Sequence, residues 1–165
     1  MKNILIPTDF TAESLEQIGM LAERDNTNRF RIMLVHFIKL SDSIPELMLL
    51  SQRTKEYAYI TDEFIAQIEA WRKQYGSQIQ SIRAEFFYGS TAAVFQNYLE
   101  ANDIEEIAYD ANYSWKKACK NSIDPAMLIV RSGLPVTGLD KEVIKTTARE
   151  EFAAGRIAGQ LVPSA

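Results

Sequence analysis

The hydrophobic pattern of the N-terminal part of the chain predicts a strand, a helix and a second strand. Residues 2–6 and 30–38 are short apolar runs, which are typical of strands buried on both faces of a parallel sheet. Between these runs, apolar residues recur at helical spacing from Thr11, which can cap the start of a helix, to about Arg24. The chain therefore begins with a β-α-β pattern.

The same alternation continues along the rest of the chain. A long helix, in one or two pieces, is expected between a capping box at 43–46 and Gly76. Its apolar residues step by three and four and predict a single stripe, made of Tyr57, Ile60, Phe64, Ile68, Trp71 and Tyr75. A third strand is expected at 79–88, followed by a turn and cap at Gly89–Ser90 before a helix. A weaker fourth strand is expected at 104–109, and a polar stretch follows it at 110–122. The last expected elements are a short helix, capped by Ser122 and closed by Gly133, and a fifth strand from Leu134.

This order of elements predicts an α/β fold. Strands that alternate with helices imply right-handed crossovers and a parallel sheet covered on both faces. In such sheets ligands bind beyond the carboxyl ends of the strands. Apolar residues spaced four apart after residue 140 predict an amphipathic tail, so the expected organisation is one domain at 1–140 and a C-terminal helical extension at 141–165.

Composition narrows the class of protein. A length of 165 residues suits one domain, and a net charge of -4 argues against a nucleic-acid partner. No apolar run reaches the roughly 18 residues that a membrane span needs, so no membrane partner is expected. The start of the chain lacks the pattern of a signal peptide, and the single cysteine, Cys119, excludes an internal disulfide and a cysteine-pair metal site. These features together predict a cytoplasmic protein.

The N-terminal residues also resemble a known family. "KNILIPTD", followed by "LVHF", is similar to the opening of a universal stress protein domain, whose first strand is Lys-x-Ile-Leu-Val-Pro-x-Asp. The matching residues are Lys2, Ile4, Leu5, Ile6, Pro7, Thr8, Asp9, Val35 and His36. A looser likeness continues to about residue 138. The resemblance implies a three-layer α/β/α domain, Rossmann-like and of the adenine nucleotide alpha hydrolase-like kind, with an open five-stranded parallel sheet in the order 3-2-1-4-5.

The resemblance also identifies a departure from the family pattern. Nucleotide-binding members carry Gly-x2-Gly-x9-Gly-Ser/Thr after the fourth strand, and those glycines let backbone N–H groups approach the phosphates. Here no glycine lies between Tyr109 and Ser122; Asp110 stands at the first glycine and Asn121 at the last. Side chains there would crowd a triphosphate, and Asp110 would repel it. We therefore expect ATP or AMP to bind weakly or not at all by the usual mode.

The candidate site follows from the same resemblance. It comprises Pro7, Thr8, Asp9, Val35, Asp110, Asn121 and Ser122. In nucleotide-binding members the aspartate that matches Asp9 lies near the adenine and ribose, and the backbone at the position of Val35 reaches the base. Asp9 would then face a polar ligand or water in the crevice. The alternative is that Asp9 accepts backbone N–H bonds at the start of the first helix, and the sequence leaves both readings open.

Other polar residues have a functional and an ordinary interpretation. Trp115 could stack on a base while Lys116, Lys117 and Lys120 neutralise phosphate, but a basic surface helix with Trp115 toward the core is favoured. Cys119 lies among these lysines without a partner His or Cys, so a passive thiol is expected.

The sequence predicts no catalytic residue and no metal ligand. His36 is the only histidine, and packing near the crevice is favoured over catalysis for it. Asp9 and Asp110 are expected to lie close together at the ends of neighbouring strands, where they could hold a divalent cation or act as an acid–base pair. Nothing in the sequence supplies a nucleophile or a third ligand to go with them.

Three functional hypotheses follow. The favoured one is a cytoplasmic, non-enzymatic stress-response protein without a resident cofactor, which acts as a homodimer through ligand sensing or protein contacts. Family dimers commonly form through the last strand, which Pro135 and Gly138 weaken here, so the tail is expected to supply part of the interface. The second is a module that binds ATP or AMP through Asp9 and a non-standard phosphate grip. The third is an enzyme related to the adenine-nucleotide hydrolases.

Overall fold

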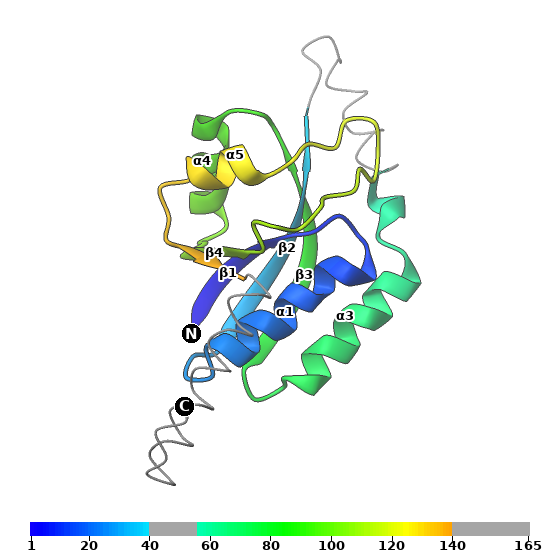
Figure 1. The fold of residues 1–165 in the computed structure, drawn as a ribbon, viewed down its shortest axis with the longest axis vertical. Coiled ribbons are helices and arrows are strands. Elements are labelled where there is room, and N and C mark those ends of the chain that lie inside the picture. The colour runs from blue at the N-terminus through cyan, green and yellow to red at the C-terminus, as the bar shows by residue number, and fades with distance from the viewer. Residues whose placement is uncertain (40–55, 140–165) are drawn as a thin grey trace, which may run out of the picture.

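The computed structural model describes residues 1–39 and 56–139, which form a five-stranded sheet with helices on both faces (Figure 1). The strand order is β3-β2-β1-β4-β5, and every pairing between neighbours is parallel. The predicted α/β class and the order 3-2-1-4-5 are therefore confirmed. The expected capping box at 43–46 and the expected tail at 141–165 lie outside the described residues.

The elements agree closely with the sequence pattern. The strands are β1 (Lys2–Pro7), β2 (Phe30–Ile38), β3 (Ile79–Tyr88), β4 (Glu106–Tyr109) and β5 (Val136–Gly138). The helices are α1 (Ala12–Arg24), α3 (Asp62–Gln74), α4 (Ala92–Ala101) and α5 (Ala126–Val130), with a short 3₁₀ turn, η1, at Tyr57–Tyr59.

β1 lies at the centre of the sheet. It pairs with β2 from Lys2 opposite Phe30 to Pro7 opposite Val35, and with β4 on its other side. Because both of its edges and both of its faces are covered, Ile4, Leu5 and Ile6 are completely buried. This position explains why the first apolar run of the sequence is continuous rather than alternating.

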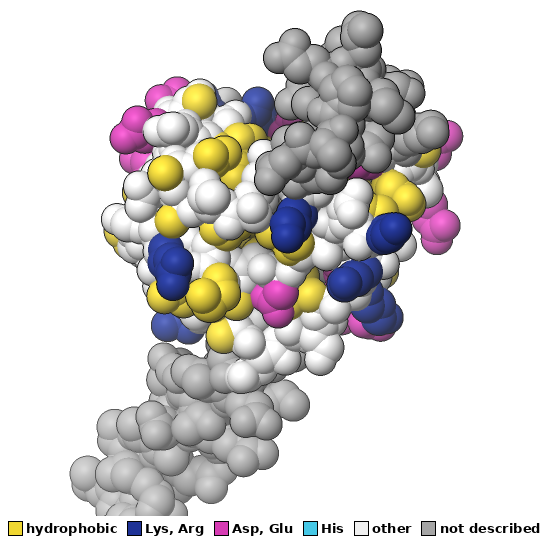
Figure 2. Space-filling view, turned by 90° about the horizontal axis from the view of Figure 1, so that it is seen from above, with side chains coloured by type: hydrophobic (Ala, Val, Ile, Leu, Met, Phe, Trp, Pro, Cys, Tyr) yellow, Lys and Arg dark blue, Asp and Glu magenta, His cyan; other side chains and the backbone are white. Residues whose placement is uncertain are grey.

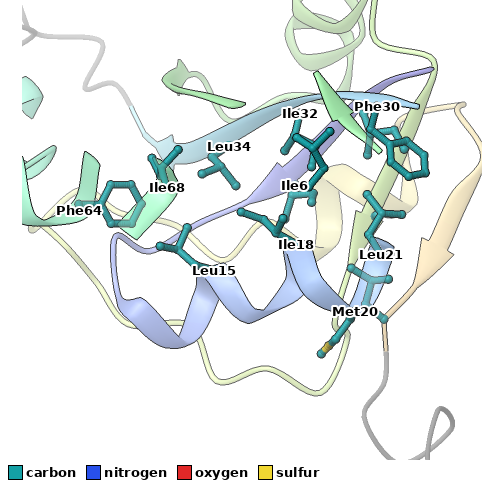
Figure 3. Close-up of a cluster of buried hydrophobic side chains, with 14 residues drawn as sticks. Ile6, Leu15, Ile18, Met20, Leu21, Phe30, Ile32, Leu34, Phe64 and Ile68 are labelled. Atoms are coloured by element: carbon teal, nitrogen blue, oxygen red, sulfur yellow. The ribbon is translucent and has the colours of Figure 1, made fainter. Parts of the chain in front are cut away.

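The helices α1 and α3 cover one face of the sheet. Leu15 and Ile18 of α1 point toward Ile6 and Leu34 of the strands, and Phe64 and Ile68 of α3 complete the layer (Figure 3). Thr11 caps α1, as predicted: its side chain accepts a hydrogen bond from the backbone N–H of Ser14. The core on this face therefore holds the N-terminal end of α1 directly beside the carboxyl end of β1.

The helices α4 and α5 cover the other face, where aromatic residues of β2, β3 and α4 pack together. The rings of Phe37, Phe87 and Phe95 lie with centroids 5.1–5.7 Å apart, and all three side chains are buried. Phe37 and Phe87 stand near the carboxyl ends of β2 and β3. The aromatic part of α4 therefore covers the same end of the sheet that carries the candidate site.

Two helix starts differ from the sequence prediction, and a third agrees with one of its alternatives. The stripe from Tyr57 to Tyr75 is broken, as the expected two pieces allow, because Thr61 caps a new start by accepting from the backbone N–H of Phe64. Thr91 caps α4 in place of Ser90. Ser122 does not cap α5, which begins at Ala126 after Pro125.

One face of the described surface is of mixed polarity (Figure 2). Among the described residues, no helix is long and apolar enough to cross a membrane. The face in Figure 2 carries Lys and Arg side chains together with Asp and Glu side chains, with apolar groups scattered between them. This face is therefore neither uniformly positive nor uniformly negative.

Gly19 tests the packing of α1 against α3. A Cβ atom at this position would lie 2.7 Å from Cζ3 of Trp71, which is closer than packed atoms approach. Trp71 itself stacks on Tyr75, so it cannot retreat without disturbing a second ring. We expect Gly19→Val to lower the free energy of unfolding by about 1–3 kcal/mol, measured by urea denaturation.

A matched control is Ala66→Val, which places the same β-branched side chain at an exposed position of α3. It should cost about 0.5 kcal/mol, from helix propensity alone. Equal effects of the two substitutions would contradict close α1–α3 packing at Gly19.

Candidate functional site

The predicted site residues come together at the carboxyl ends of β1, β2 and β4. Pro7 ends β1 opposite Val35, and the backbone N–H of Thr8 donates to the carbonyl of Val35 at 2.9 Å. Asp9 lies two residues after β1 and Asp110 directly follows β4, and these two strands are parallel neighbours. Both carboxylates are therefore at the same end of the sheet, as the sequence predicts.

The carboxylate of Asp9 is buried and receives hydrogen bonds from three residues of its own chain. Thr11 donates its hydroxyl at 2.6 Å and its backbone N–H at 3.2 Å to Oδ1. The hydroxyl of Tyr113 donates to Oδ2 at 2.9 Å, and the backbone N–H of Lys116 donates to the same oxygen at 3.0 Å. Asp9 is 4% exposed. It therefore both accepts a backbone N–H just before the first helix, which is one of the two readings expected, and holds a distant segment of the chain.

These hydrogen bonds decide the charge state of Asp9. Burial acts to raise its pKa, but the donors on Thr11, Lys116 and Tyr113 outweigh burial and lower the pKa below its ordinary value. The carboxylate is therefore ionised at neutral pH. In turn, burial and the neighbouring carboxylate raise the pKa of the Tyr113 hydroxyl to about 12, which keeps it a donor.

The segment that reaches Asp9 is the polar stretch after β4. In Figure 1 it leaves β4, crosses toward the start of α1 and returns to α5. Lys116 also places its ammonium 3.7 Å from a carboxylate oxygen of Glu13, while Trp115 packs against the α4-side core. The expected basic helix at this place is wrong, because residues 110–125 form isolated turns and no helix before α5. Its backbone N–H at Lys116 bonds to Asp9 instead.

Gln17 joins the ends of β1 and β4. Its side-chain amide donates from Nε2 to the carbonyl of Pro7 at 3.0 Å, and its Oε1 accepts from the backbone N–H of Asp110, also at 3.0 Å. The side chain is 1% exposed, so both bonds form away from water. A buried glutamine on the inner face of an amphipathic helix is the sequence signal that could have identified it.

His36 forms a second link to the same segment. Its Nδ1 lies 2.7 Å from the carbonyl of Thr8, and its Nε2 lies 2.7 Å from the hydroxyl of Ser122. A carbonyl only accepts, so Nδ1 carries the proton and Nε2 accepts from Ser122. Burial lowers the pKa of His36, and the ring is neutral at pH 7. His36 is thus a packed structural residue, as expected.

Ser122 and Asn121 anchor the far end of the segment to β2. The hydroxyl of Ser122 accepts from the backbone N–H of Cys119 at 3.0 Å while it donates to His36. The carbonyl of Asn121 accepts from the backbone N–H of Lys39 at 2.8 Å. Ser122 therefore joins a hydrogen-bond chain in the interior instead of capping α5, because three residues separate it from the first turn of that helix.

Phe10 fills the space between His36 and α3. Its φ angle is 64°, in the left-handed region that side chains other than glycine rarely adopt. The ring lies with its centroid 4.8 Å from that of His36, 5.5 Å from Phe64 and 5.3 Å from Phe86. The strain of this backbone conformation costs on the order of 1–3 kcal/mol, and the ring contacts of Phe10 offset it.

Asp110 borders a polar cavity of about 390 Å³ between α1 and the segment after β4. One of its oxygens accepts from the backbone N–H of Asn112 at 2.9 Å. The cavity is also lined by Glu13, Glu16 and Lys116, so carboxylates outnumber amines around it. Among the described residues, no group of three or more histidines, cysteines and carboxylates could hold a metal ion.

This arrangement defines the class of fold to which the site belongs. No protein-family model and no curated protein matches the sequence. Among solved structures, the chain is similar to a hypothetical protein, PH0823, at 17% identity and a TM-score of 0.56, over 84% of this chain and 95% of that one.

Two further structures give the same result. The universal stress protein UspA from Lactobacillus plantarum is 13% identical at a TM-score of 0.54, over 83% of this chain and 96% of that one. A hypothetical protein, MJ0577, is 16% identical at a TM-score of 0.50, over 85% and 96%. The chain therefore has the universal stress protein fold, which confirms the family resemblance at the level of the fold.

The neutral His36 predicts how stability changes with pH. Because its pKa in the folded protein is lowered, the unfolded chain binds a proton more readily near its ordinary pKa of about 6.5. Its contribution to stability is therefore complete above about pH 6.5 and declines as the pH falls below that value. We expect the free energy of unfolding, measured by urea denaturation, to fall between pH 7 and pH 5.

Since His36 is the only histidine, His36→Gln should remove most of this dependence of the free energy of unfolding on pH. Any pH dependence that remains should come from carboxylates. A wild-type slope that the variant keeps would show that protonation of His36 is not coupled to folding.

The donors around Asp9 predict the effect of Asp9→Asn. The amide keeps one acceptor oxygen but turns an NH₂ group toward donors that then have no acceptor. We expect a loss of about 1–3 kcal/mol in the free energy of unfolding at pH 7. Tyr113→Phe, which removes one donor, should cost about 1 kcal/mol. The control Asp62→Asn, at an exposed carboxylate in the first turn of α3, should cost clearly less than Asp9→Asn.

Proposed function

We propose that this chain is a non-enzymatic, cytoplasmic binding protein of the universal stress protein type that acts as a homodimer and does not hold ATP through a glycine loop. The observation that supports this most directly is the hydrogen bonding of Asp9. Thr11, Tyr113 and Lys116 already satisfy the carboxylate. A nucleotide that used Asp9 would have to break these bonds without a gain in their number.

The charge around the segment after β4 also argues against ATP binding. Glu13, Glu16 and Asp110 line the cavity there, and only Lys116 among its lining residues is cationic. The ammonium of Lys116 already lies beside Glu13. A triphosphate carries several negative charges, so a net acidic cavity would repel it. The second hypothesis, an ATP or AMP module built on Asp9 and these lysines, therefore has less support.

Exposed apolar residues support the homodimer. Met127 and Val130 of α5 are 63% and 76% exposed, and Val136 of β5 is 43% exposed. β5 is the last strand of the described sheet, and only β4 pairs with it among the described residues. An edge strand beside exposed apolar side chains is suited to pairing with a second copy. In such a dimer the protein would act through contacts with other proteins or through a small ligand.

Native mass spectrometry of freshly purified full-length protein tests this proposal. We expect the mass of a dimer without a retained nucleotide, and no specific adduct when ATP and Mg²⁺ are added. The double variant Val130→Asp/Val136→Asp should shift the protein to monomer, because it buries like charges at the proposed interface. Ile65→Asp, at a residue 46% exposed on α3, is the matched control and should leave the dimer intact.

Two results would overturn the proposal. One is a stoichiometric ATP or AMP adduct that Asp9→Ala abolishes, which would establish the nucleotide-binding module instead. The other is a monomeric wild-type protein at micromolar concentration.

A further inference from the structure

A second polar cavity lies at the opposite end of the sheet from the crevice. Its volume is about 260 Å³, and its polar lining comprises Asn3, Arg31, Ser81, Arg83, Asn102 and Asp103. Asn3 and Arg31 stand at the beginnings of β1 and β2, whereas Asp9 and His36 stand at the carboxyl ends of those strands. We propose that this cavity binds a small oxyanion, a molecule with a phosphate or carboxylate group, between Arg31 and Arg83.

The register of the strands places both arginines on one face. Arg31 pairs with Ser81 and Met33 pairs with Arg83, so these four side chains project toward the side of the sheet that carries α4. The aromatic residues of α4 cover the carboxyl half of this face. The half nearer the amino ends stays open, and the arginines reach it from rigid strands rather than from loops. Such positions favour a fixed binding geometry.

The guanidinium of Arg83 is held by neutral groups. Its Nη2 lies 3.2 Å from Oδ1 of Asn102 and 3.2 Å from the sulfur of Met33. In the described part of the chain, neither Arg31 nor Arg83 forms an ion pair. Asp103 supplies the one carboxylate among the lining residues, so the cavity has a surplus of one positive charge. This surplus stands out in a protein with a net charge of -4.

The backbone carbonyls at the end of α4 are already hydrogen-bonded, so they do not face the cavity as unpaired acceptors that would repel an anion. The carbonyl of Tyr98 accepts from the backbone and side-chain N–H groups of Asn102. Those of Leu99 and Glu100 accept from the backbone N–H groups of Ile104 and Asp103. The negative end of the helix dipole at the cavity is thereby largely compensated.

The size and chemistry of the cavity limit its ligand. The cavity volume of about 260 Å³ lies below the roughly 300–1,000 Å³ that is typical of pockets for drug-sized ligands, so a small molecule is the expected ligand. Arginine binds carboxylates and phosphates through two parallel N–H bonds, and amide side chains can hydrogen-bond their remaining oxygens.

Isothermal titration calorimetry with full-length protein tests the proposal, with inorganic phosphate and succinate as separate probes at constant ionic strength set by sodium chloride. We expect saturable binding of at least one probe. Arg31→Gln and Arg83→Gln should each weaken it about tenfold or more. Asp103→Asn should strengthen it, because it removes the opposing charge. The matched control Arg131→Gln, at an exposed arginine after α5, should leave the affinity unchanged.

The comparison of probes identifies the source of the oxyanion, since the tighter probe indicates whether phosphate or carboxylate is preferred. Both arginines are exposed, so their variants should keep the wild-type melting temperature, which shows that they fold. The proposal is overturned if neither probe binds saturably, or if Arg131→Gln weakens binding as much as Arg31→Gln and Arg83→Gln do. Neither result bears on the proposed function, which depends on Asp9 and the dimer surface.

Discussion

The end of the sheet depends on one buried negative charge. An ionised carboxylate away from water is unfavourable unless donors surround it, and here the donors must come from the protein. Thr11 supplies two of them from the start of α1, whereas Tyr113 and Lys116 supply the others from about a hundred residues further along the chain. The course of the segment after β4 is therefore set by what Asp9 requires, although that segment has no regular secondary structure of its own.

Gln17 and His36 extend the same principle. Gln17 satisfies the carbonyl of Pro7 and the N–H of Asp110, and His36 satisfies the carbonyl of Thr8 while it accepts from Ser122. Parallel strands necessarily end with polar backbone groups at the same edge. In an open crevice, a ligand or water would complete these groups. In this chain the side chains of Gln17 and His36 complete them, and these hydrogen bonds form a structural joint between the strand ends and the segment after β4.

The sequence could predict the fold because the relevant signals are local. Continuous apolar runs identify central strands, the three-and-four spacing in α1 identifies its inner face, and Thr11 stands where a cap is needed. The family resemblance added the position of Asp9 and the absence of glycines after β4. These features follow from residues that lie within a few positions of one another.

The details that could not be predicted depend on contacts between distant residues or on single backbone angles. Nothing near Tyr113 or Lys116 marks them as donors to Asp9, because the partner lies on another element. The same holds for Ser122, whose hydroxyl is drawn to His36 instead of to the start of α5. The caps at Thr61 and Thr91 depend on which of several neighbouring polar residues takes the extended conformation, and the sequence offers more than one choice.

The double attachment of the segment after β4 has an evolutionary consequence. Irregular loops usually tolerate insertions and deletions, because few of their atoms are committed to the rest of the protein. Here the backbone N–H of Lys116 is hydrogen-bonded to Asp9, and the hydroxyl of Ser122 is hydrogen-bonded to His36. An insertion or deletion in this segment would therefore have to leave both attachments in place, which makes it less tolerant of changes in length than an unattached loop.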